Sequence, residues 1–295
     1  MVPKTSKLEP AVPNVDQFES VFKSAAKAVY RYKPIKLERA LMVSDLDVPR
    51  AQTLVEQVRG FLGVAGQSVQ WTTLDAEQSR TVEGLLGAIQ QQQPDLVCTY
   101  RNLHTSAWRW PHSLGRHLDV LTQATNCPVM VIPRPNADAD LQKALGQATV
   151  VMAMTDHLAG DDQLVNFAVS LTRPDGTLYL SHIEDEAILD RYIKTISKIP
   201  TINTDNAHTQ IRRQLLKEPG DYIDSCRRAL KQHNLPIQIE PIVGIGHHLG
   251  GYRQLVTEHG VDLLLMNTKD EDQLAMHGMA YPLAVELRET PLLML

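Results

Sequence analysis

The chain has 295 residues and a mass of 33.0 kDa, which is enough for two domains of about 150 residues each. Apolar residues make up 43% and charged residues 21%, a mixture typical of a globular protein and not of a disordered one. The net charge of −5 argues against nucleic acid as the main partner, and no apolar run reaches the roughly 18 residues of a membrane span. The three cysteines are predicted to be reduced thiols of a cytoplasmic protein.

The N-terminal segment has the opposite charge to the rest of the chain. Residues 1–39 hold eight basic and four acidic side chains. Apolar residues recur there at helical spacing, and Asp16 with Glu19 has the spacing of an N-terminal capping box. We predict a helix over 16–31 in a basic N-terminal arm of residues 1–38. This arm is expected to dock on the first domain, and an arm that docks on a partner or on an anionic membrane surface is the alternative.

Short aliphatic runs alternate with helical patterns along the remaining chain. Most runs are continuously apolar, which indicates strands covered on both faces, and the alternation predicts a parallel sheet with helices on both sides. Strands are predicted at 40–44, 96–98, 129–132, 149–154, 177–183, 236–243, 263–266 and 292–295. Helices are predicted around 82–89, 114–121, 249–256 and 280–287, with a long helical region over 185–233 that is broken at Pro200 and at Pro219-Gly220.

An internal repeat divides the chain into two similar blocks. Each block has a strand preceded by an aspartate, then a helix opened by a glycine, and finally a strand opened by a proline. In both blocks the glycine and the proline are 13 positions apart. The repeated positions are Asp95, Gly115 and Pro128 in the first block, and Asp262, Gly278 and Pro291 in the second.

The repeat predicts a first domain at 39–134 and a second at 147–295, joined by a polar, Pro-rich stretch that begins at Pro133. From Asp45 to the repeated aspartate the first domain spans 50 residues, whereas the matching stretch from Asp156 spans 106. The difference is enough for a whole strand–helix unit. We therefore predict that the first domain lacks one.

These elements resemble the universal stress protein family, in a tandem arrangement. The similarity rests on a first strand that ends in the acid Asp45, on the aspartate before the fourth strand, and on the repeated glycine–proline spacing; it covers about 40–133 and 147–295. The resemblance implies an α/β fold of two open parallel-sheet, Rossmann-like domains with flanking helices, related by a pseudo-two-fold axis. It also implies that the final strands, 129–132 and 292–295, pair antiparallel, which would bury two apolar sheet edges.

Nucleotide-binding members of that family carry a glycine-rich loop whose backbone N–H groups approach a phosphate at a helix N-terminus. In the second domain Asn267 opens the matching loop, Gly278 is the one glycine that remains, and carboxylates occupy 270–272, where a triphosphate would lie. Unit charges about 4 Å apart repel by roughly 4 kcal/mol at an intermediate dielectric. Thr155 also displaces the strand-end acid to Asp156. ATP or another nucleotide is therefore possible but disfavoured as a cofactor, and the site is predicted to be degenerate.

In the first domain Asp45 and Gly115 match the family pattern, and the loop of residues 101–113 before Gly115 is cationic. An anion, if one is bound, is expected near Arg101, Arg109 and Arg116, close to a helix N-terminus. Because this domain lacks a unit that would wall a base pocket, a degenerate pseudo-site is the leading interpretation. A remodelled ligand site in the loop is the alternative.

Two further motifs have simple structural interpretations. Gly244 and Gly246 lie between a predicted strand and a helix, and they indicate a tight turn more than a fragment of a dinucleotide motif. The histidines near the predicted strand ends are interpreted as surface residues, and no metal site is predicted. They are His157, His247, His248, His259 and His277.

We therefore predict a non-catalytic tandem universal stress protein with a binding or regulatory role in stress response or signalling. Its expected partners are its own second domain, a second copy in a possible homodimer, and an unknown protein; nucleic acid is not expected. Membrane contact is expected only through a transporter or the basic arm. The alternatives are a cytosolic regulatory region of a membrane transporter, and a nucleotide-binding hydrolase or transferase of the same superfamily.

Overall fold

The computed structural model describes residues 29–109, 112–135, 141–155, 162–201, 203–268 and 279–295. Nine strands form its sheet. They are β1 (Arg39–Val43), β2 (Gln70–Leu74), β3 (Leu96–Tyr100), β4 (Val129–Ile132), β5 (Val150–Met154), β6 (Thr177–Asp185), β7 (Gln238–Gly246), β8 (Leu263–Met266) and β9 (Leu292–Met294). The helices are α2 (Val48–Phe61), α3 (Val64–Gln67), α4 (Val82–Gln92), α5 (Arg116–Ala124), α6 (Leu141–Ala144), α7 (Asp162–Leu171), α8 (Glu186–Ile196), α9 (Thr204–Gln232), α10 (His248–Glu258) and α11 (Ala280–Glu286), with a 3₁₀ turn at Ala107–Arg109.

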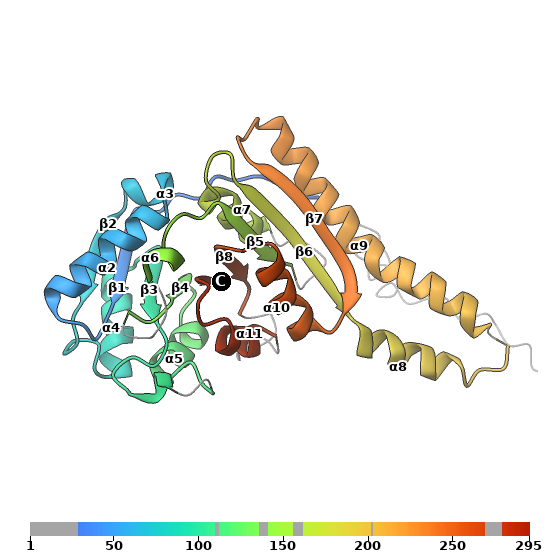
Figure 1. Ribbon diagram of the computed structural model, residues 1–295, viewed down its shortest axis with the longest axis horizontal. Coiled ribbons are helices and arrows are strands. Elements are labelled where there is room, and N and C mark those ends of the chain that lie inside the picture. Colours follow the sequence, from blue (N-terminus) through green and yellow to red (C-terminus); the bar gives the residue numbers. More distant parts are fainter. Residues whose placement is uncertain (1–28, 110–111, 136–140, 156–161, 202, 269–278) are drawn as a thin grey trace, which may run out of the picture.

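The sheet runs in the order β2-β1-β3-β4-β9-β8-β5-β6-β7 through the whole molecule (Figure 1). Its neighbours are parallel except for β4 and β9, which are antiparallel. The chain up to β4 contributes four strands and the chain from β5 contributes five. The predicted α/β fold with an open, mostly parallel sheet is confirmed, and so is the shorter first half.

The two halves meet where β4 pairs with β9. Val129, Met130 and Val131 lie opposite Met294, Leu293 and Leu292, and all six side chains are buried. The predicted antiparallel pairing is confirmed, and neither strand is left as an exposed edge. Because the pairing is antiparallel, the amino ends of the first half's strands share one edge of the sheet with the carboxyl ends of the second half's strands. The division into separate domains stays a prediction.

The repeated aspartates have a structural role in both halves. Asp95 Oδ2 accepts hydrogen bonds from the backbone N–H groups of Glu38 and Arg39, each at 2.9 Å, at the start of β1. Asp262 Oδ2 accepts the equivalent pair at the start of β5, at 3.0 and 2.8 Å. Each carboxylate therefore caps the neighbouring strand at the point where ladder hydrogen bonds begin.

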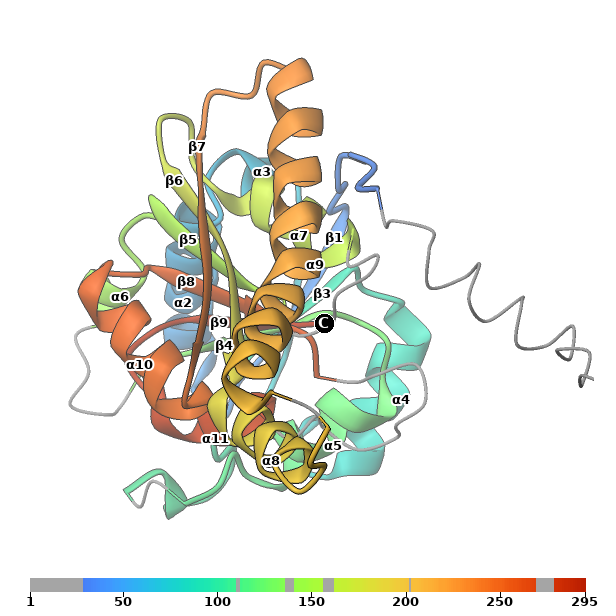
Figure 2. The same ribbon diagram turned by 90° about the vertical axis from the view of Figure 1, so that its right-hand side faces the viewer.

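Helices cover both faces of the second half. The views of Figures 1 and 2 place α7 and α9 on one face and α10 and α11 on the other. The outer part of α9 continues past the sheet beside α8, so that the two helices form an arm that projects from the body (Figure 1). No helix among the described residues is long and apolar enough to cross a membrane.

One sequence prediction about helices is wrong, one is confirmed, and one lies almost wholly outside the described residues. The break expected at Pro219-Gly220 does not occur, because α9 is a single helix of 29 residues with Pro219 inside it. The break at Pro200 is confirmed, since it falls between α8 and α9. The N-terminal helix predicted over 16–31 lies outside the described residues except at its end, and residues 29–31 are not helical.

The start of the described chain packs on the second half, not on the first half as expected. The backbone N–H of Tyr30 donates to Ser225 Oγ of α9 at 3.2 Å, and the Tyr30 hydroxyl donates to Asn166 Oδ1 of α7 at 2.6 Å. The same Oδ1 accepts the N–H of Lys33 at 3.1 Å. The Tyr30 ring is buried against these helices. This segment therefore anchors the chain that leads into β1 to helices α7 and α9 of the second half.

Candidate functional site

Ligands of open parallel sheets bind beyond the carboxyl ends of the strands. In the first half four residues meet there, and we call them the Asp45 cluster: Asp45 after β1, Tyr100 at the end of β3, His104 in the following loop, and Arg134 after β4. Asp45 Oδ1 accepts a hydrogen bond from the Tyr100 hydroxyl. Asp45 Oδ2 accepts from the backbone N–H of His104 at 2.8 Å and from Arg134 Nη2 at 2.9 Å. Both carboxylate oxygens are thus engaged by the protein itself.

Arg134 closes the cluster from above the strand ends. Its Nη1 donates to the carbonyl oxygens of Arg101 and Asn102, at 3.1 and 3.0 Å. Its guanidinium carbon lies 4.9 Å from the centre of the Tyr100 ring, within reach of a cation–π contact. Only 10% of the Arg134 side chain and 12% of the Asp45 side chain are exposed. The ion pair is therefore largely shielded from water.

The protonation states suit this closed arrangement. Burial tends to raise the pKa of Asp45, but the hydrogen bonds from Tyr100, Arg134 and the His104 amide outweigh burial and hold that pKa below its usual value. Burial and the hydrogen bond to Asp45 raise the pKa of the Tyr100 hydroxyl. At neutral pH the carboxylate is therefore ionised and the phenol remains a neutral donor.

Gly115 is required by the backbone geometry next to the cluster. Its φ is +90°, where side chains are strongly disfavoured, and a Cβ there would lie 2.8 Å from the Cα of Asn102. Asn102 itself is buried, and its backbone N–H donates to the carbonyl of Leu114 at 2.8 Å. The glycine that matches the family pattern is thus explained by contact with Asn102, without a phosphate.

Arg101 does not lie in an anion site. Its Nε donates to the carbonyl of Ala284 at 2.7 Å and its Nη2 to the carbonyl of Leu287 at 2.6 Å, at the carboxyl end of α11. Burial and, to a smaller extent, the charge of Arg288 lower its pKa to about 10, so it stays charged at neutral pH. Arg101 therefore caps a helix of the other half.

Arg109 and Arg116 lie at the surface, whereas Arg101 is buried under α11. Arg101 is therefore not free to bind the anion expected near these three arginines, because its guanidinium is engaged by α11.

Solved structures with a similar arrangement were found. A universal stress protein from Archaeoglobus fulgidus DSM 4304 matches with a TM-score of 0.51 and 8% identity, over 88% of this chain and 96% of that one. The chain has the universal stress protein fold. A putative universal stress protein from Pseudomonas aeruginosa UCBPP-PA14 gives a TM-score of 0.48 and 12% identity, over 88% of this chain and 93% of that one. A functionally unknown protein from Pseudomonas aeruginosa PAO1 gives a TM-score of 0.46 and 11% identity, over 88% of this chain and 92% of that one.

No protein-family model and no curated protein matches the sequence. At the identities found, structural similarity establishes the fold and says nothing about a ligand.

In the second half of the universal stress protein fold, the predicted site residues that the structure describes do not come together. Asp156 and Gly278 lie outside the described residues. Asn267 follows β8, but Gly244 and Gly246 lie within β7, and β5 and β6 separate these strands. The turn predicted at the two glycines is wrong, because β7 continues to Gly246.

The strand-end position before Asp156 is occupied by a residue whose polar groups are satisfied. The Thr155 hydroxyl donates to the carbonyl of Ser181 at 3.0 Å, and the Thr155 carbonyl lies 2.6 Å from Nδ1 of the buried His182. Thr155 is itself buried. This described part of the edge therefore holds the strands together.

A serine–histidine pair that the sequence analysis did not identify lies beside the Asp45 cluster. His104 Nε2 is 3.0 Å from Ser79 Oγ, but the Ser79 hydroxyl donates to the carbonyl of Asp75 at 2.8 Å. Because the Ser79 hydroxyl is already donated, Ser79 Oγ accepts a hydrogen bond from the imidazole N–H, whereas a nucleophilic serine would need to donate to the histidine. Ser79 is also fully buried, so no substrate can reach it. The pair is structural.

The described histidines do not form a metal site. Among the described residues, no group of three or more His, Cys, Asp and Glu side chains is placed to hold a metal ion. His259 packs against the Tyr179 ring at 4.4 Å, and His247 is exposed at the start of α10. His157 and His277 lie outside the described residues.

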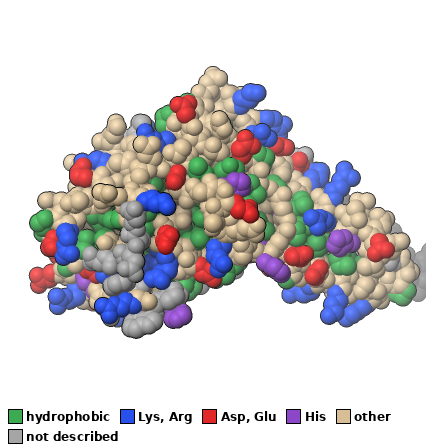
Figure 3. Space-filling model, in the orientation of Figure 1, with side chains coloured by type: hydrophobic (Ala, Val, Ile, Leu, Met, Phe, Trp, Pro, Cys, Tyr) green, Lys and Arg blue, Asp and Glu red, His purple; other side chains and the backbone are tan. Residues whose placement is uncertain are grey.

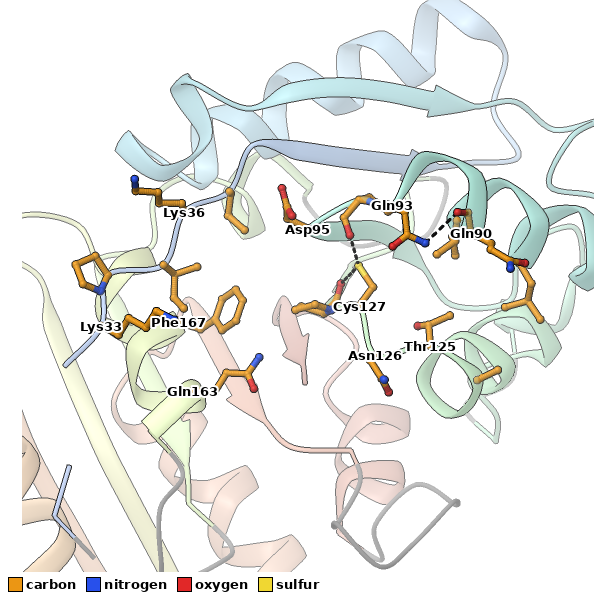
Figure 4. Close-up of a pocket in the computed structure, with 18 residues that line it drawn as sticks. Lys33, Lys36, Gln90, Gln93, Asp95, Thr125, Asn126, Cys127, Gln163 and Phe167 are labelled. Atoms are coloured by element: carbon orange, nitrogen blue, oxygen red, sulfur yellow. Dashed lines mark hydrogen bonds between the residues drawn. The ribbon is translucent and has the colours of Figure 1, made fainter. Parts of the chain in front are cut away.

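A groove of about 910 Å³ lies between the halves, beside the amino ends of β3 and β4 (Figure 4). Residues 33–37, the end of α4, the turn after α5, and Gln163 and Phe167 of α7 line it. Cys127 Sγ donates to the carbonyl of Pro94 at 3.1 Å, and burial raises its pKa to about 12, so it is a neutral thiol. The groove thus offers side-chain amides, two lysines and an apolar wall to a ligand. Its polar lining includes Lys33, Lys36, Gln90, Gln93, Thr125, Asn126 and Gln163.

Proposed function

We propose that this chain is a non-catalytic regulatory protein with the universal stress protein fold, acting in stress response or signalling, whose first-half nucleotide position is closed by its own side chains. The observation that carries the proposal is the saturation of Asp45. Its two carboxylate oxygens accept hydrogen bonds from Tyr100, His104 and Arg134. A ligand that used this acid would have to displace them.

The displacement is energetically expensive. A hydrogen bond to a charged group contributes about 1.5–3 kcal/mol. Replacing two of the three bonds would therefore cost a ligand roughly 3–6 kcal/mol, or about two to four orders of magnitude in Kd. Displaced Arg134 would in addition lose its bonds to the Arg101 and Asn102 carbonyls. Nucleotide binding at this position is disfavoured for this reason.

The groove of Figure 4 supports a binding role of a different kind. It is bordered by both halves, since Gln93 and Asn126 belong to the first half and Gln163 and Phe167 to the second. A small molecule bound there would contact both halves at once, and ligand sites are frequent at such junctions. Ligand binding in the groove would then change the relative position of the two halves, which suits a regulatory protein.

Titration calorimetry of the nucleotide-free chain with Mg·ATP tests the proposal. We expect no saturable heat below about 1 mM, because the Asp45 cluster has to open first. The matched variants are Asp45→Asn and Asp47→Asn, which remove neighbouring acids; Asp47 is an exposed N-cap, and asparagine also serves as one. One-to-one ATP binding with a Kd below about 100 μM that is lost in Asp45→Asn and kept in Asp47→Asn would overturn the proposal.

A further inference from the structure

The distal arm, which we define as residues 191–201 and 203–217 at the ends of α8 and α9, is strongly basic. It has six basic side chains and one acidic side chain, a net of +5, while the rest of the chain carries −10. All six basic residues are exposed, and Figure 3 shows basic side chains spread over the projecting arm. They are Arg191, Lys194, Lys198, Arg212, Arg213 and Lys217.

Two exposed apolar side chains lie among these charges. Tyr192 is 49% exposed and Ile199 is 43% exposed, and they are two of the four large apolar side chains that are exposed in the described part of the chain. At 100° per residue, Arg191 and Lys194 lie within about 60° of each other on one side of α8, and Tyr192 lies between Arg191 and the buried Leu189. α8 therefore has a cationic side, with the partly exposed Tyr192 ring at the margin of its inner face.

The arm holds its charges away from the acidic body. Among the residues of α9, full burial begins at Pro219. The fourteen residues from Thr204 to Lys217 thus rise about 21 Å beyond that point, compared with a Debye length of about 8 Å at physiological ionic strength. Figure 1 shows α8 and this part of α9 projecting from the body. Repulsion or attraction by the body is therefore screened, and the arm can bind an anionic surface independently.

We propose that the distal arm docks on an anionic membrane surface, with Tyr192 and Ile199 in the interface and the basic side chains among the lipid headgroups. Helices that carry four to eight Lys and Arg bind anionic leaflets, and tyrosine favours the headgroup level. Three of the six basic residues are lysines, which are depleted at protein–protein interfaces, and two isolated apolar residues do not form an apolar interface core. These features favour a lipid surface over a protein partner.

Co-sedimentation of the full chain with vesicles tests the proposal. The vesicles are phosphatidylcholine alone, or phosphatidylcholine with about 30% phosphatidylglycerol, a composition chosen for its negative surface potential. We expect binding to the anionic vesicles only, weakening as salt is raised. The variant Lys194→Gln, Lys198→Gln, Arg213→Gln should lower the partition coefficient about 100-fold, since each basic side chain contributes about fivefold.

The same helix provides a matched control. Arg227→Gln, Arg228→Gln, Lys231→Gln removes three exposed charges from the part of α9 next to the sheet, and it should leave vesicle binding within about threefold of wild type. Tyr192→Ser with Ile199→Ser should weaken binding about tenfold and leave its salt dependence unchanged. Circular dichroism checks that each variant is folded.

Three results would overturn the proposal. The first is equal binding of the wild type to neutral and anionic vesicles, or none to either. The second is an equal loss in the distal and proximal triple variants. The third is a dimer by light scattering that the distal triple variant abolishes, with no vesicle binding, which would assign the arm to the acidic body of a second copy.

Discussion

Leu293 joins the two halves of the sheet, and its truncation should destabilise both together. In β9 it lies opposite Met130 of β4 on one side and Leu265 of β8 on the other, and its side chain is fully buried. Leu293→Ala removes buried methyl groups and leaves a cavity, a change that costs about 2–5 kcal/mol in comparable cores. For a chain of this size that corresponds to a fall in Tm of about 3–8 °C.

Differential scanning calorimetry of the wild type, Leu293→Ala and Leu178→Ala is the appropriate measurement. Leu178 is equally buried but lies in β6, three strands away from β9 in the sheet order. If the halves unfold as one unit, both variants should move one common transition to lower temperature. Two resolved transitions, of which Leu293→Ala moves only one, would show that the halves are merely tethered and would refute this reasoning.

Three other substitutions have defined outcomes. Asp45→Asn should lower stability by about 2 kcal/mol at pH 7. The folded pKa of Asp45 is depressed, so its contribution to the free energy of unfolding is complete above the unfolded pKa of about 3.9 and is lost as pH falls through the folded pKa. In urea titrations the free energy of unfolding of the variant should therefore fall less steeply at acid pH than that of the wild type. Gly115→Ala should destabilise the protein by more than about 1 kcal/mol, because of the positive φ and the close contact with the backbone of Asn102. The control Gly87→Ala, in open space on α4, should be neutral or stabilising in the same urea titration. Equal effects of the two substitutions would contradict the packing argument. Arg101→Met should cost about 2–4 kcal/mol in thermal unfolding by leaving two carbonyls of the other half without their donor, and a neutral result would exclude a capping role.

The sheet could be predicted from the sequence wherever its strands are continuously apolar. The pairing of β4 with β9 was implied by the family resemblance, and it agrees with the apolar character of two strands that would otherwise be exposed edges. The edge strand β2 was not predicted, because Gln70, Thr72 and Thr73 are exposed and interrupt any apolar pattern. An edge strand needs only one covered side, so it leaves a weak signal in the sequence.

The helix through Pro219 shows where local rules are overridden. A proline inside a helix costs about 3 kcal/mol, which predicts a break. In α9 the following turns bury Tyr222, Ile223, Cys226 and Leu230. Burial of such side chains contributes about 1.5–3 kcal/mol each, so packing outweighs the cost of the proline.

The candidate site could be predicted only in part. Asp45 and Gly115 were identified because they occupy strand-end and helix-start positions that ligands use. The hydrogen-bond partners of Asp45 could not be predicted, because Tyr100 is 55 positions and Arg134 is 89 positions away in the sequence. The capping role of Arg101 could not be predicted either, because the carbonyl of Ala284 is 183 positions away. The tertiary fold decides which hydrogen-bond donor pairs with which acceptor, and the net charge of a loop does not reveal these pairs.

A double-mutant cycle between Asp45 and Arg134 tests the closed Asp45 cluster most directly. Urea unfolding of the wild type, Asp45→Asn, Arg134→Gln and the double variant gives the coupling energy of the pair. The 2.9 Å contact and the shielding of both side chains predict a coupling of more than about 1 kcal/mol at pH 7, falling as Asp45 is protonated. A coupling indistinguishable from zero would show that the carboxylate is free to serve a ligand, and would contradict the closed cluster.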